Sequence, residues 1–180
     1  MSRFSEIHQA YIDARKAFFA ERDRCAAFAA DLLDGLERYL GCPPAHLRFI
    51  PHGGLTSSVK TREAQATPTI DADGIWHCEA ALEIGDTAVG AHKESARQTI
   101  HFELLLQPTA AGFNVGIRGT AERFSLPPLP ASSATPRPPT DSPERTAFYE
   151  YLFQRMVESY RQPGQRFFET LADSKRRIGG

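Results

Sequence analysis

Cysteine is scarce in this sequence and does not follow a disulfide or metal-binding pattern. The three cysteines, Cys25, Cys42 and Cys78, are an odd number at wide spacings. Such spacings match neither a disulfide framework nor a zinc site built from closely spaced ligand pairs. Cys25 and Cys78 fall on apolar stripes, so we expect both to be buried as small hydrophobic residues.

Long apolar runs are absent as well. No stretch of the 180 residues approaches the roughly 20 apolar residues that cross a bilayer, and residues 1–6 lack the apolar core of a secretion signal. Hydrophobic residues make up 41% and charged residues 24% of the sequence, which is ordinary for a globular protein with a real core. We therefore expect a single cytoplasmic domain that spans residues 1–180.

Neither sign of charge is in large excess. The sequence has 21 Lys and Arg against 22 Asp and Glu, and the two signs are balanced in each part of the chain. Proteins that bind nucleic acid usually carry a basic face or tail. Here the basic cluster, residues 175–177, lies at the C-terminus, where positive charge favours a helix end. We expect neither nucleic-acid binding nor membrane insertion.

The catalytic motifs that can be recognised by spacing are missing. The sequence has no Gly-x-Ser-x-Gly, no glycine fingerprint for dinucleotides and no His-Glu-x-x-His. The glycines within 52–58 lack the Gly-Lys-Ser/Thr ending of a phosphate-binding loop. No Pro-Cys-x-x-Cys follows the His-x-Glu motifs described below, which excludes a deaminase site. The interpretation we favour is a protein without enzymatic activity.

What the sequence does contain is an ordered succession of helical and strand patterns. A helical pattern fills residues 1–41, strand patterns lie within 45–125, a proline-rich strap covers 126–143 and a second helical pattern fills 144–180. Strands that are grouped between helices, rather than alternating with them, predict an α+β fold with an antiparallel sheet. We expect a meander of four or five strands, covered on one face by a long N-terminal helix and C-terminal helices.

The N-terminal helical pattern is a single apolar stripe. It runs from Phe4 to Tyr39 in steps of three or four residues, with one break at Glu21 and Arg22. Two interpretations follow: the helix bends at the break, or it stays straight for about 54 Å and pairs with another copy. We favour packing on the sheet for at least the second half.

Alternating polar and apolar side chains mark the strands. The pattern is clear at 76–84, 99–107 and 113–124, and the turn at 108–112 joins the last two into a hairpin. Residues 71–74 form a strong turn signal before the first of these strands.

Other elements carry weaker signals. Residues 47–51 and 57–66 are the remaining strand candidates. The second helix is expected to begin after Asp141 or Ser142 and to break at Pro163, with a short helix beyond it.

The sharpest candidate site is a repeated His-x-Glu, formed by His77 with Glu79 and by His101 with Glu103. Period two places each pair on the polar face of its strand, so the four side chains converge if the two strands are neighbours. Two imidazoles and two carboxylates suit a divalent transition metal, although an ordinary polar sheet face needs no ligand. Apart from this metal we expect no cofactor. The same face is expected to carry Glu83, Asn114, Arg118 and Glu122.

Aromatic residues are concentrated in the predicted helices. They give five candidate partner-binding residues: Phe4, Tyr11, Phe18, Tyr151 and Phe167. Our first functional hypothesis is a binding, regulatory or adaptor domain that contacts a protein partner or itself, for example as a homodimer. It predicts an exposed apolar helical face. The alternative is a small-ligand or metal-binding protein or enzyme, which predicts that the His-x-Glu residues converge in a concave site.

Overall fold

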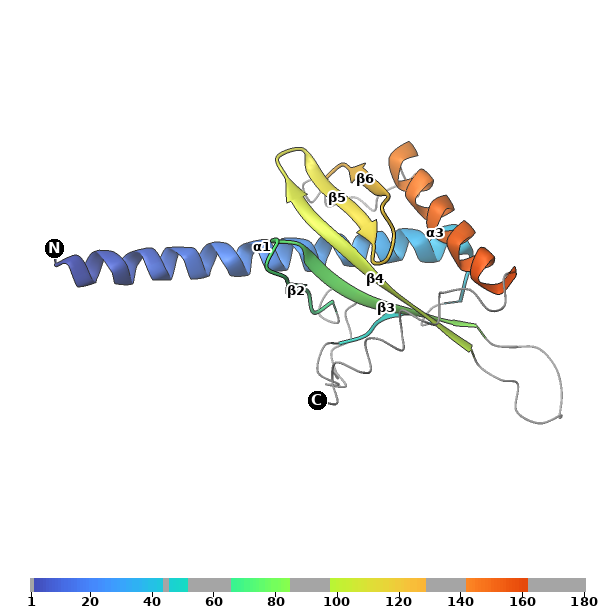
Figure 1. Ribbon diagram of the computed structural model, residues 1–180, viewed down its shortest axis with the longest axis horizontal. Coiled ribbons are helices and arrows are strands. Elements are labelled where there is room, and N and C mark those ends of the chain that lie inside the picture. Colours follow the sequence, from blue (N-terminus) through green and yellow to red (C-terminus); the bar gives the residue numbers. More distant parts are fainter. Residues whose placement is uncertain (1, 44–45, 52–65, 85–97, 129–141, 162–180) are drawn as a thin grey trace.

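The chain folds into a helix, an antiparallel sheet and a second helix (Figure 1). This computed structural model describes residues 2–43, 46–51, 66–84, 98–128 and 142–161. In chain order the elements are α1 (Arg3–Leu40), β1 (Leu47–Phe49), β2 (Thr69–Ile70), β3 (Trp76–Ile84), β4 (Gln98–Thr109), β5 (Gly112–Ile117), β6 (Arg123–Leu126) and α3 (Pro143–Arg161). The α+β prediction is confirmed.

Helix α1 is continuous over 38 residues, so the bend at Glu21 and Arg22 does not occur. Both of its ends are capped. Ser2 caps the first turn by accepting a hydrogen bond from the Ser5 backbone N–H at 3.2 Å. Gly41 ends the helix in a left-handed conformation, with φ at 61°, which a residue without a Cβ adopts without strain.

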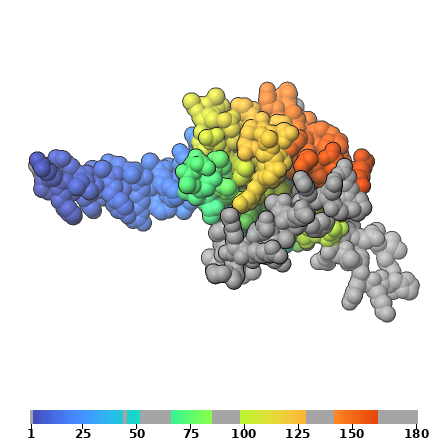
Figure 2. All heavy atoms as spheres, viewed as in Figure 1, coloured from blue at the N-terminus to red at the C-terminus, as the bar shows by residue number. Residues whose placement is uncertain are grey.

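The two halves of α1 have different surroundings. Its buried residues all lie between Cys25 and Leu36, where the helix packs on the sheet. Residues 3–17 extend away from the rest of the molecule, as the space-filling view shows (Figure 2). We call residues 3–17 the projecting segment. The expectation that the second half packs on the sheet is confirmed.

The sheet is an antiparallel meander in the order β1-β3-β4-β5-β6, and the short β2 also pairs with β3. Register is set by apolar pairs on the inner face: Cys78 lies opposite Leu104, and Leu104 in turn lies opposite Ile117. The same period two places His77, Glu79 and their neighbours on the other face.

The strands differ from the prediction in two places. The expected strand at 113–124 is two strands, β5 and β6, separated by a turn in which Gly119 has φ at 82°. The Thr120 N–H closes this turn on the Ile117 carbonyl at 3.1 Å. Strand β2 was not predicted, because two residues are too few to show alternation.

Several predicted features lie outside the described residues. They are the strand at 57–66 apart from Ala66, most of the proline-rich strap, the break at Pro163 and the short helix that contains Phe167. Helix α3 begins at Pro143 as expected, with the Ser142 carbonyl accepting from the Thr146 N–H at 3.0 Å.

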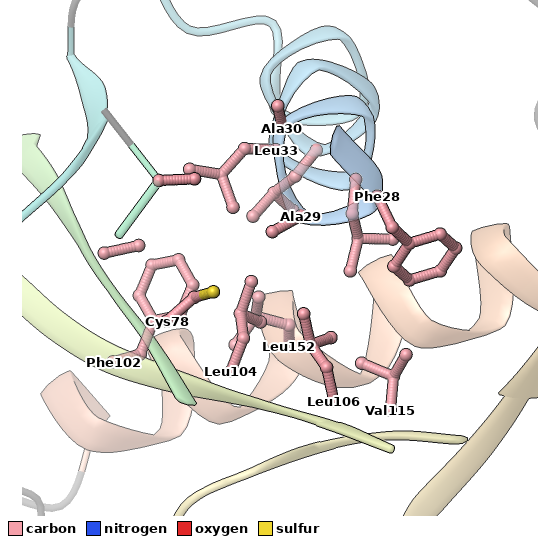
Figure 3. Packing of buried hydrophobic residues seen from close by; sticks show 14 of the residues in the cluster. Phe28, Ala29, Ala30, Leu33, Cys78, Phe102, Leu104, Leu106, Val115 and Leu152 are labelled. Carbon is pink, nitrogen blue, oxygen red and sulfur yellow. The ribbon is translucent and has the colours of Figure 1, made fainter. Parts of the chain in front are cut away.

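The core lies between the sheet and the two helices (Figure 3). Phe28 of α1 stacks on Phe113 of β5, with ring centroids 3.9 Å apart. Helix α3 joins this layer through Leu152 and through Arg145, a buried arginine that forms an ion pair with Asp31 of α1. Cys25 and Cys78 are buried, as predicted. One face of the sheet is therefore covered by helices, and the other carries the polar side chains.

Candidate functional site

A tight turn before β3 positions the first residue of the polar site. Asp71 accepts hydrogen bonds through Oδ1 from the backbone N–H groups of Asp73 and Ile75, both at 2.9 Å. Gly74 supplies the left-handed φ of 76° that the turn requires. These bonds leave the second carboxylate oxygen of Asp71 beside His77, where Oδ2 lies 2.9 Å from Nε2.

His77 is held from both sides. Its other ring nitrogen, Nδ1, lies 2.5 Å from Oε1 of Glu103, which comes from the neighbouring strand β4. A neutral imidazole has one N–H, whereas a protonated one donates from both nitrogens. The His77 ring therefore donates to both carboxylates at once only in its protonated form. The two hydrogen-bonding distances fix the orientation of the ring.

Glu79 and Glu103 lie directly opposite each other on β3 and β4. Like charges in this arrangement repel each other. Arg118, which follows β5, offsets the repulsion by donating from Nη1 to Oε2 of Glu103 at 2.8 Å. This hydrogen bond, followed by the charges of Glu103 and Glu79, raises the pKa of the Arg118 guanidinium.

Asp71 is also favoured in its charged form. The hydrogen bond from His77 is the largest cause that lowers the pKa of the Asp71 carboxyl, and the N–H of Ile75 lowers it further. A chain of hydrogen bonds thus runs from Asp71 through His77 and Glu103 to Arg118.

This hydrogen-bonded chain lies in a concavity of about 250 Å³. Its lining residues are Ile50, Thr67, Thr69, Ile70, Asp71, His77, Glu79, Glu103 and Arg118. Three of the four predicted site residues are therefore brought together. The fourth, His101, lies opposite Ala81, farther along the strands, and is not among the lining residues.

The described part of the chain contains no group of three or more His, Cys, Asp or Glu side chains that could hold a metal ion. Both ring nitrogens of His77 face carboxylates, so coordination of a metal by His77 would displace Asp71 or Glu103. Metal binding by His77, Glu79, His101 and Glu103 stays a prediction.

The sequence indicated some members of this site and missed another. The alternation of side chains along the strand predicted that Arg118 lies on the polar face. Asp71 was predicted only as a turn residue, because nothing in the sequence shows that its turn folds back on His77. Glu83, expected on the same face, forms an ion pair with Arg48 of β1 at 2.9 Å.

The candidate partner-binding residues fall into different environments. Phe4 and Tyr11 are 75% and 61% exposed in the projecting segment, where Ile7 is 69% exposed. Phe18 is 43% exposed, and its ring centroid lies 5.3 Å from that of Trp76. Together they form an open apolar stripe.

Tyr151 lies in a more enclosed place. It is half-buried beside Phe124, with ring centroids 5.3 Å apart, and its hydroxyl donates to Glu122 at 2.8 Å. Phe167 lies outside the described residues.

Comparisons with protein-family models, curated proteins and solved structures found no match. Neither helix in the described residues has the length and apolar character needed to cross a membrane.

Proposed function

We propose that this chain is a non-enzymatic binding domain, of the adaptor or regulatory type, that engages a protein partner through the projecting segment of α1. One observation carries the proposal: the stripe that packs on the sheet between Cys25 and Leu36 continues into solvent as Phe4, Ile7 and Tyr11.

The energetics support a partner. Covering Phe4 or Ile7 completely contributes roughly 1.5–3 kcal/mol relative to leaving the side chain in water. A helix segment that serves only as a solvated extension needs no such stripe. Large apolar side chains that are contiguous on a surface are typical of interaction sites.

A site-specific crosslinker tests this proposal. A photoreactive phenylalanine analogue replaces Tyr11 in one version of the chain and Asp13, on another side of the helix, in the control. We expect irradiation in cells that naturally contain the chain to give a discrete protein adduct from position 11 and none from position 13. Equal adducts from both positions, or none from position 11, would contradict the proposal.

Self-association is the simplest form of such contact. Sedimentation velocity on the purified chain measures it directly, and Ile7→Ser with Tyr11→Ser is the variant that removes the stripe. A homodimer that dissociates in this variant would identify a second copy as the partner. A monomer at all concentrations would require a different protein.

The concavity on the polar face supports a second candidate function, the binding of a small cationic ligand or a metal ion. The carboxylates of Asp71, Glu79 and Glu103 outnumber the positive groups around it. Glu79 is exposed and makes no ion pair with the residues that the structure describes.

Native mass spectrometry of the untagged chain, with metal analysis of the same sample, tests the second candidate. We expect a bound ion or adduct that is lost in His77→Ala and retained in His101→Ala, because His101 lies outside the lining. Bare chains in all three samples would rule out a ligand that survives purification.

A further inference from the structure

The charges around the projecting segment are not distributed evenly, and their distribution distinguishes between classes of partner. We propose that the partner is an α-helix of another protein whose apolar stripe is bordered by Asp and Glu side chains. This inference rests on the proposed function and specifies the partner's chemistry.

The stripe has the spacing of a helix–helix seam. Its members are alternately three and four residues apart: Phe4, Ile7, Tyr11, Ala14 and Phe18. In such a seam two kinds of position border the partner helix. They are the residues just before Phe4, Tyr11 and Phe18 and the residues just after Ile7 and Ala14. Here those positions hold Arg3, His8, Ala10, Arg15 and Ala17. None of them is acidic, so the seam is bordered by basic and small residues.

The two acidic residues of the segment, Glu6 and Asp13, lie away from the seam border. They are seven residues apart, so they share one side of the helix. Asp13 also accepts a hydrogen bond from Gln9, one turn earlier, at 3.0 Å. A partner on the stripe would therefore meet Arg3 and Arg15 but not these carboxylates.

A second copy of the chain would gain no electrostatic attraction from this arrangement of charges. In parallel or antiparallel pairs of identical helices, the bordering positions meet one another. Arg3, His8 and Arg15 would then face basic residues or alanines, and no attractive ion pair would form. A partner helix with Asp and Glu at its bordering positions would instead place these side chains beside both arginines. The resulting ion pairs would favour one orientation of the partner and select it over partners without acidic borders.

An anionic membrane fits less well than an acidic helix. Helices that lie in a membrane surface carry Lys and Arg across their polar face. The polar side of the projecting segment carries Glu6 and Asp13, and residues 3–17 contain only three Lys and Arg side chains.

The segment is also preformed for docking. Ser2 caps its first turn, and Phe18 rests on Trp76 where the helix meets the sheet. Its 15 residues extend about 22 Å, enough for a partner of two heptads. Because the helix is already folded, binding costs little ordering of its backbone. Ala14 leaves room in the seam for a larger side chain of the partner.

Two synthetic peptides test this inference with the full chain. Each has about three heptads with Leu at the seam positions; one carries Glu at all bordering positions, and the control carries Lys there. Fluorescence anisotropy measures the affinity of each. We expect the Glu peptide to bind at least about tenfold more tightly, with the difference shrinking as salt increases.

Charge reversal provides the matched variants. Arg3→Glu with Arg15→Glu should invert the preference between the peptides, whereas Glu6→Lys with Asp13→Lys should leave it unchanged. All four residues are exposed, so the helix is expected to persist, and circular dichroism verifies this.

Three outcomes would overturn the inference. Equal affinity for both peptides would remove the role of charge. Binding only to vesicles of phosphatidylserine and phosphatidylcholine would assign the segment to membranes. A homodimer that binds neither peptide and dissociates in Ile7→Ser with Tyr11→Ser would reject an acidic partner while supporting the proposed function. Crosslinking from position 11 decides the proposed function independently.

Discussion

Trp76 of β3 donates its indole N–H to Oε1 of Glu21 on α1, at a distance of 3.1 Å. Glu21 is the residue at which the apolar stripe of α1 is interrupted. The interruption is therefore not a bend but the place where the helix meets the edge of the core. Trp76 is buried, whereas the part of α1 on the N-terminal side of this contact is exposed.

This contact gives the first prediction, that Trp76 and Glu21 are energetically coupled. The hydrogen bond joins a buried indole to a charged acceptor, so we expect a coupling energy of about 1–2 kcal/mol. Urea denaturation of Trp76→Phe, Glu21→Ala and the double variant measures it. Additive effects of the two substitutions would contradict the prediction.

The second prediction separates the two halves of α1. Ile7→Ser changes a side chain in the projecting segment, and we expect it to alter the free energy of unfolding by no more than about 0.5 kcal/mol. Leu33→Ala removes a buried side chain from the packed half and should cost about 2–5 kcal/mol. Denaturant unfolding at low protein concentration, where association is absent, measures both. A large loss in Ile7→Ser would show that the segment packs within its own chain.

The third prediction concerns acid. The pKa of Asp71 is lowered in the fold from its ordinary value of 3.8, first by the hydrogen bond from His77. A lowered pKa means that the ionised carboxylate stabilises the fold above the ordinary pKa and that this contribution is lost as pH falls through the lowered one. We expect the loss of stability below about pH 4 to be less steep in Asp71→Asn than in the wild type.

Asp73→Asn is the control for this pH dependence. It removes a carboxylate from the same turn, and no described residue donates a hydrogen bond to the Asp73 side chain. Thermal unfolding followed between neutral and acid pH compares the three chains. Identical slopes in Asp71→Asn and Asp73→Asn would show that the contact with His77 does not hold in solution.

The fourth prediction orders the reactivity of the thiols. Burial, as the largest cause, raises the pKa of both Cys25 and Cys78 to about 12. Because the thiolate is the reactive form, both should resist alkylation at pH 8 in the folded protein. Cys42 is half-buried and should react first. Mass spectrometry of peptides after timed labelling measures the order, and rapid modification of Cys78 would be the opposite result.

The sequence predicted the architecture because the architecture depends on local periodicity. Strand β3 was predicted with its observed bounds, since the buried Trp76, Cys78 and Ala80 alternate with the polar His77 and Glu79. The N-terminal helix was predicted for the same reason, since its apolar residues recur in steps of three or four. The turn that divides β5 from β6 was missed because Gly119 interrupts the alternation only locally.

The candidate site was less accessible to prediction because it depends on register. Period two placed His77 and Glu103 on one face, but their contact requires the particular pairing that sets His77 opposite Leu105. The same pairing carries His101 away from the concavity. Asp71 joins the site through a turn that folds back on the sheet. No residue pattern in the sequence predicts that this turn brings the Asp71 carboxylate to His77.

The final prediction tests the packing of α3 on α1. Gly35 has no Cβ, and a methyl group there would overlap the hydroxyl of the buried Tyr149 and come within 2.8 Å of its ring atom Cζ. We expect Gly35→Ala to destabilise the fold by about 1–3 kcal/mol, because the buried Tyr149 would have to shift to admit the methyl group. Denaturant unfolding of this variant, of Tyr149→Phe and of the double variant measures the coupling. Tyr149→Phe removes the atom nearest to the added methyl group. The double variant should therefore lose less free energy of unfolding than the sum of the two single variants. Strict additivity would show that the two helices lie farther apart.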